Sequence, residues 1–139
     1  MSDLVAKGLI EARMATYAGT LEIFWPNTLE PVEAANNAGW IRAEFATGSE
    51  AAFQADTHGG GGTFRQPGLF IASIFTPRGG GAGGTEADAI AALFRGQRDV
   101  SGTVKVVYRA PNIREVGADD HWYQTDVEVP YEYDSSFST

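Results

Sequence analysis

Apolar residues near the N-terminus recur at helical spacing. Intervals of three and four residues place side chains on one face of a helix. The apolar positions are Ala6, Leu9, Ile10, Met14 and Tyr17. Ser2 is suited to cap the start of such a helix, and Gly19 stands where a C-terminal stop is expected. The pattern predicts a helix over about residues 3–18.

Alternating apolar and polar residues follow, which is typical of half-buried strands. Residues 21–25 alternate before the turn signal Pro26-Asn27, and residues 40–47 alternate again. In the second segment Ile41, Ala43 and Phe45 share one face, while Arg42 and Glu44 share the other. We predict a strand in each segment and a weaker one over residues 51–55.

The most apolar stretch of the chain lies in the middle of the sequence. Residues 68–75 are almost continuously apolar and stand between Pro67 and Pro77, so we predict a central strand there. Four consecutive glycines, Gly59–Gly62, precede it. Because glycine loses the most conformational freedom on folding, we do not expect this run to join a packed element.

A second helix is predicted to begin at a variant of the capping box. Thr85 stands three residues before Asp88, which takes the place of the usual glutamate. The apolar stripe that follows is Ala87, Ile90, Ala91 and Phe94. Gly96 marks the expected end of this helix.

Two further strands are predicted near the C-terminus, over residues 103–109 and 122–134. The first places Val104, Val106 and Tyr108 on one face. The apolar face of the second consists of Tyr123, Val127, Val129, Tyr131 and Tyr133. Pro130 indicates an edge position or a bulge.

The order of these elements favours an α+β fold. Helix, strands, helix and strands lack the repeated alternation of a doubly wound sheet, and the last two strands are expected to form a hairpin. We therefore predict a mostly antiparallel or mixed sheet flanked by two main helices. One domain over residues 1–139 fits the chain length, with a flexible tail over residues 135–139.

Composition and charge exclude several function classes. The chain has 139 residues and no cysteine, which excludes thiolate catalysis, cysteine zinc sites and disulfide scaffolds. Its formal net charge of −8 argues against a phosphate backbone or an anionic membrane as main partner. No apolar stretch is long enough to span a membrane, and the N-terminus lacks the basic start of a signal peptide.

The second glycine cluster offers the clearest candidate for a cofactor site. Residues 79–84 satisfy G-x-G-x-x-G between a predicted strand and a predicted helix. The acidic residue about 20 positions on, Asp99, precedes the next strand where the dinucleotide-binding pattern would place it at the strand's end. Because five glycines in six positions match any glycine motif, we expect a mobile or assembly-dependent loop and no cofactor.

Other catalytic constellations are weak. His58 follows Asp56, and His121 follows Asp119-Asp120, which gives two acid–imidazole groups in turn-like stretches. A metal site needs three or four ligands on rigid elements, so we expect no metal there. No G-x-S-x-G nucleophile motif occurs.

The last predicted strand carries carboxylates on alternate residues. They are Asp126, Glu128, Glu132 and Asp134. A charged, solvated face that protects a sheet edge is one interpretation. The other is electrostatic, because a negative ridge lining a pore would repel DNA sliding through it.

Short motifs along almost the whole chain resemble one known family. They include Trp25-Pro26-Asn27, Gly68-Leu69-Phe70, Ile74-Phe75-Thr76-Pro77-Arg78-Gly79, Ala87-Asp88-Ala89-Ile90, Phe94-Arg95-Gly96, Trp122-Tyr123-Gln124 and Val129-Pro130-Tyr131. In order and spacing the sequence is similar to the tail-terminator-like proteins of long-tailed phages and prophages. The glycine tract at residues 79–84 departs from the family pattern in length.

The resemblance implies a structural protein, with no cofactor and no enzymatic activity. It implies a ring, commonly hexameric, that caps the tail tube at the head-proximal end of the virion, after assembly in the host cytoplasm. The expected partners are further copies of the chain, the tail tube protein and a head–tail completion protein, with DNA passing through unbound. Candidate assembly contacts are Arg42, Glu44, Arg78, Gly79, Gly81, Gly84, Lys105 and Arg109.

Two alternatives remain open from the sequence. The first is another component of the same particle, a head–tail joining or tube protein. The second is a small nucleotide- or cofactor-binding protein that uses the loop Gly79–Gly84 at a helix N-terminus as an anion site.

Overall fold

A computed structural model describes residues 2–19, 21–26, 39–46, 53–56, 61–77, 83–118 and 122–138. Its α+β architecture confirms the predicted class. The elements in chain order are α1 (Ser2–Met14), β1 (Glu22–Phe24), β2 (Trp40–Ala46), β3 (Phe53–Asp56), β4 (Gly61–Pro77), α2 (Gly83–Phe94), β5 (Arg98–Ser101), β6 (Val104–Tyr108), β7 (Asn112–Ala118) and β8 (Trp122–Ser138).

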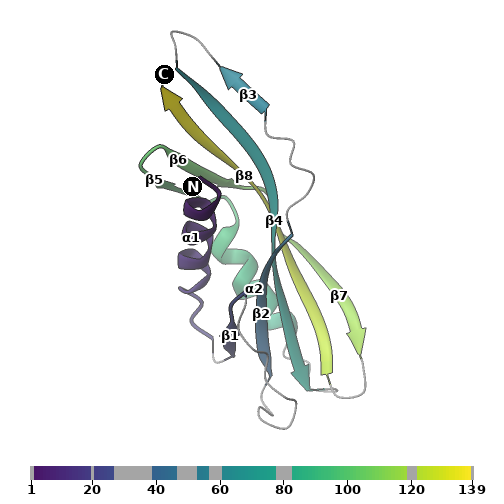
Figure 1. Ribbon diagram of the computed structural model, residues 1–139. Helices are drawn as coiled ribbons and strands as arrows, with labels where there is room; N and C mark the ends of the chain where they lie inside the picture. Colours follow the sequence, from purple (N-terminus) through teal and green to yellow (C-terminus); the bar gives the residue numbers. More distant parts are fainter. Residues whose placement is uncertain are drawn as a thin grey trace.

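Two long antiparallel strands form the spine of the sheet (Figure 1). β4 and β8 pair along their full length, from Gly61 opposite Ser138 to Pro77 opposite Trp122. Each then carries two shorter strands on its other edge: β2 and β3 on β4, and β7 and β6 on β8. β1 adds to β2 in parallel and β5 adds to β6, so the sheet is mixed and curls into a half-barrel.

Both helices cover the same face of this sheet. Figure 1 shows α1 and α2 side by side, and their apolar stripes enter one core with the inward residues of β2, β4, β6 and β8. Phe70 and Phe94 lie at its centre, fully buried, with ring centroids 5.6 Å apart. The predicted apolar stripes of both helices are therefore confirmed. The prediction of a sheet flanked by two helices is refined, because both helices lie on one face of the sheet.

The two prolines in the spine occupy gaps between the shorter strands. Pro67 lies in β4 between the segment that pairs with β3 and the segment that pairs with β2. Pro130 lies in β8 between the segments that pair with β7 and β6. Among the described strands, none pairs with either proline on the side away from the spine, so no pairing there requires the N–H that proline lacks. An interior strand can therefore contain proline at these two positions. Pro67 therefore does not bound the strand, and Pro130 does not place β8 at the edge of the sheet.

Several predicted boundaries were wrong. α1 ends at Met14 in a tight turn, since the backbone N–H of Tyr17 donates to the carbonyl of Met14 at 3.0 Å. Gly61 and Gly62 belong to β4, because β8 supplies partners for their backbone groups. Residues 135–138, expected to form a flexible tail, continue β8 along the same pairing.

The C-terminal half contains two strands that the alternation did not predict. β5 and β7 are short and exposed on most positions, so they lack a buried apolar face. β7 also separates the two strands that were expected to form a direct hairpin. Those strands, β6 and β8, do pair antiparallel.

Candidate functional site

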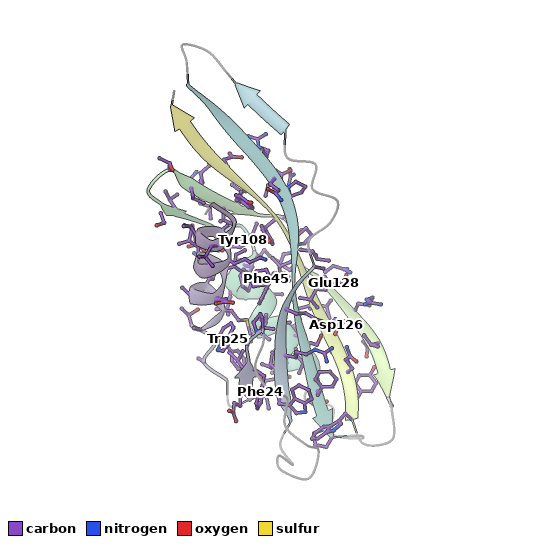
Figure 2. All side chains as sticks on the ribbon, in the orientation of Figure 1. Phe24, Trp25, Phe45, Tyr108, Asp126 and Glu128 are labelled. Atoms are coloured by element: carbon purple, nitrogen blue, oxygen red, sulfur yellow. The ribbon has the colours of Figure 1, made fainter. Side chains whose placement is uncertain are left out.

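The face of the sheet opposite the helices, called here the outer face, carries most of the predicted site residues. A row of polar side chains crosses it at one register: Arg42 on β2, Ser73 on β4, Asp126 on β8 and Arg114 on β7. Ser73 and Asp126 are buried within this row, at 1% and 5% exposure. Figure 2 shows Asp126 and Glu128 on the side of the molecule that carries β7.

Each of the four β8 carboxylates has an arginine partner. Arg114 is 3.4 Å from Asp126 and 3.3 Å from Glu128. The other two pairs are Arg109–Glu132 at 2.9 Å and Arg65–Asp134 at 2.8 Å. Three guanidinium groups thus face four carboxylates, so the predicted acidic ridge is nearly neutral.

Two of these arginines, Arg65 and Arg114, were not predicted from the sequence. Both stand directly opposite their carboxylates in the sheet register, Arg65 opposite Asp134 and Arg114 opposite Asp126. Arg114 lies on β7, whose alternation was too weak to predict. Charged residues on neighbouring strands are the signal, but it becomes readable only once the register is known.

The predicted contacts Arg42 and Glu44 lie on β2 and pair with each other at 3.7 Å. The Arg42 guanidinium also sits 5.3 Å from the ring centroid of Phe75, which stacks on Trp40 at 4.2 Å. Arg42 is therefore held against an aromatic pair and its own strand neighbour. This part of the outer face is ordered by aromatic packing as well as by charge.

A groove of about 580 Å³ lies between α1 and the strands β1 and β2. Aromatic side chains line it, with Phe24, Trp25 and Phe45 labelled in Figure 2. The ammonium group of Lys7 lies 5.4 Å from the ring centroid of Phe45. Aromatic side chains and arginine are enriched at protein–protein interfaces, so this groove is suited to contact with another protein.

Asp99 is engaged in a hydrogen-bond network with Arg13 and Tyr108. Arg13 donates two hydrogen bonds to its carboxylate, each 2.8 Å long, and the hydroxyl of Tyr108 donates a third at 2.6 Å. The bond from Arg13 holds the pKa of Asp99 below its ordinary value, against the effect of burial. Burial and the bond to Asp99 raise the pKa of Tyr108. The carboxylate of Asp99 thus joins α1, β5 and β6.

Lys105 and Arg109 lie close together at the other end of the outer face. Both line a shallow hollow of about 390 Å³ beside Glu132 and Asp134. Lys105 points out of β6, while Arg109 follows β6 and donates its backbone N–H to the carbonyl of Pro130 at 2.8 Å. These two predicted contacts are brought together, well apart along the chain from Arg42 and Glu44.

The glycine loop is only partly within the described residues. Arg78, Gly79 and Gly81 lie outside them, as do His58 and His121. Gly84 is exposed in the first turn of α2. Across the described ranges, no group of three or more metal-ligating side chains occurs. No described helix is long and apolar enough to cross a membrane.

Comparison with known proteins identifies the family. A solved structure superposes with a TM-score of 0.70 over 96% of this chain and 95% of that one, at 18% sequence identity, which shows a shared fold. No curated protein matches the sequence. The family model described as phage tail terminator protein matches residues 7–131. This chain therefore belongs to the phage tail terminator family, whose members are structural tail proteins.

Proposed function

We propose that this protein forms a ring, most simply a hexamer, on the head-proximal end of the tail tube. The ring ends polymerisation of the tube and offers the surface to which the filled head is joined. The family match over residues 7–131 is the observation that carries this proposal. The groove between α1, β1 and β2 supports it, since aromatic walls of this kind are suited to contact between subunits.

The proposal is tested by tube length. The tail tube protein of the same particle is polymerised with and without this chain, and tube lengths are measured by negative-stain electron microscopy. Capping predicts shorter tubes, each with extra density at one end. Tubes of unchanged length with bare ends would contradict it. Density spaced along the tube would instead favour the alternative of a tube protein.

We also propose that the β8 ridge, formed by Asp126, Glu128, Glu132 and Asp134, faces the channel through which DNA passes. Replacing Glu128 and Glu132 by glutamine would leave Arg109 without its carboxylate partner and Arg114 with only Asp126. Freed guanidinium groups bind phosphates, so DNA ejection should slow while assembly stays intact. Asp126 is left unchanged because it is buried. DNA ejection at the wild-type rate would contradict the placement of the β8 ridge in the channel.

A further inference from the structure

The cations without a carboxylate partner gather in one place. Within the described part of the chain, Arg95, Arg98 and Lys105 make no ion pair. Arg95 follows the end of α2, Arg98 begins β5 and Lys105 lies on β6. The nearest carboxylates of β8, Glu132 and Asp134, are already paired with Arg109 and Arg65, so Arg98 and Lys105 keep their charge unmatched.

Exposed valines accompany these cations on one face of the β5–β6 hairpin. Arg98 lies opposite Val107, and Val100 lies opposite Lys105, so the four side chains share a face, called here the hairpin face. Val100 is 60% exposed and Val107 is 36% exposed. Shallow hollows of about 390 and 550 Å³ lie beside Val107. Apolar surface rimmed by charge is typical of a protein-binding site.

The opposite face of the hairpin is fixed to the helices by hydrogen bonds. The carboxylate of Asp99 on β5 binds Arg13 of α1 and Tyr108 of β6. Arg13 also donates to the carbonyl of Leu93 at 3.0 Å, which ties the end of α2 to the same group. Gly102 in the turn has a φ of 59°, a conformation that favours glycine. A surface fixed in this way loses little entropy when a partner docks.

The opposite end of α2 carries the complementary charge. Glu86 and Asp88 lie in its first two turns, and Glu22 lies at the start of β1. Tyr17, just after α1, donates its hydroxyl hydrogen bond to Glu86, which brings the two segments together. Residues 15–26 and 83–94 contain no cation. The two ends are joined by α2, which has 12 residues and is about 18 Å long.

We infer that the hairpin face of one copy docks head to tail on the acidic end of a second copy, formed by Glu22, Glu86 and Asp88. The inference rests on the proposed ring and names the contact that closes it. A ring requires two different complementary patches on each chain, repeated from copy to copy. Two hairpin faces would repel each other, whereas basic and acidic ends attract and orient the approaching copies.

Self-association of the purified chain tests this contact. Native mass spectrometry and light scattering over a range of concentrations compare the wild type with the pair Arg98→Gln and Lys105→Gln. The control pair, Ala12→Glu and Ala46→Glu, makes the same change in net charge at exposed positions elsewhere. We expect the first pair to weaken association at least tenfold, and the control to stay near the wild type. Circular dichroism checks that each variant is folded.

Restoration of the contact gives a second, independent readout. Arg98→Glu with Lys105→Glu should abolish association, and adding Glu22→Lys with Asp88→Lys to the same chain should restore it. Failure of that restoration in folded variants would overturn the inference, as would wild-type association by the glutamine pair. In either case a wild type that still forms rings leaves the proposed function standing.

If the free wild type stays monomeric, the same variants are compared on tube ends. Wild-type rings on tube ends with rings lost in the glutamine pair would support the contact. If the wild type and the glutamine pair form rings on tube ends equally often, the inferred contact is overturned and the proposed function stands. A wild type that neither associates nor binds tube ends would contradict both the contact and the proposed function.

Discussion

Arg13 of α1 donates two hydrogen bonds of 2.8 Å to Asp99 of β5, which lies 86 positions later in the sequence. Both side chains are only 22% exposed, and the pair sits where α1, the end of α2 and the β5–β6 hairpin meet. Charge-assisted, bidentate bonds in such a setting are stronger than ordinary surface ion pairs. The pair therefore fixes the hairpin on the helical layer.

Replacing Asp99 by asparagine should lower the free energy of unfolding by about 2 kcal/mol, because Arg13 then loses its charged acceptor. Chemical denaturation at neutral pH measures the loss. Glu132→Gln is the matched control, since its partner Arg109 is 62% exposed and the pair should contribute less than about 1 kcal/mol. Equal losses for both variants would contradict the structural role assigned to Asp99.

Acid should abolish the difference between Asp99→Asn and the wild type. The pKa of Asp99 is lower in the folded protein than its ordinary value of 3.8. A carboxyl of this kind stabilises the fold above its unfolded pKa, and the stabilisation is lost as pH falls through the folded pKa. Denaturation curves of the two proteins should therefore approach each other as the pH falls below 3.8. A constant gap over this range would contradict the account.

Gly68→Ala should destabilise the protein. Gly68 lies opposite Tyr131 in the β4–β8 ladder, and a Cβ there would come within 2.4 Å of the tyrosine ring. Tyr131 is only 2% exposed, so its ring has little room to move. Overpacking of this kind costs about 1–3 kcal/mol. Thermal unfolding should show a lower Tm.

Gly84→Ala provides the matched control for Gly68→Ala. A Cβ at Gly84 meets nothing within 4 Å, and the residue lies in the first turn of α2. Alanine in a helix should raise stability by about 0.5–1 kcal/mol. A drop in Tm for Gly84→Ala would show that the start of α2 is packed more tightly than described.

Arg114→Ala should cost more stability than Arg109→Ala. Arg114 neutralises Asp126, which is 5% exposed and otherwise accepts a side-chain hydrogen bond from Gln124 at 2.9 Å. Leaving a buried carboxylate without its cation costs about 1–3 kcal/mol. Arg109 pairs with a carboxylate at the surface, so its loss should cost less than about 1 kcal/mol. Urea denaturation of both variants, with equal losses as the contradicting result, measures this difference.

The sequence predicted the structure well wherever burial of one face makes apolar residues recur at helix or strand spacing. Ile90 and Phe94 lie on the predicted stripe of α2, and Val104 and Val106 on the predicted face of β6. It was misleading where pairing overrides local preference. Gly61 and Pro67 both look like breakers, yet the ladder with β8 carries each of them within β4.

The site was harder to predict than the fold because its charges pair across strands. Alternation places Asp126 and Glu132 on one face, but nothing local tells that Arg114 and Arg109 lie beside them. Likewise, Arg98 and Lys105 form a basic surface because the register of β5 and β6 places them on one face. The sequence alone does not show which cations form ion pairs and which do not. Non-local pairing of this kind follows from topology, which a single sequence does not determine.

The most direct test of the central claim is the mass and shape of the assembled protein. Native mass spectrometry of the purified chain, followed by negative-stain imaging alone and on tail tubes, is predicted to show a closed ring with a central hole. A hexamer would have six times the 14.9 kDa mass of the chain. A chain that stays monomeric at every concentration and leaves the ends of tubes bare would contradict the account.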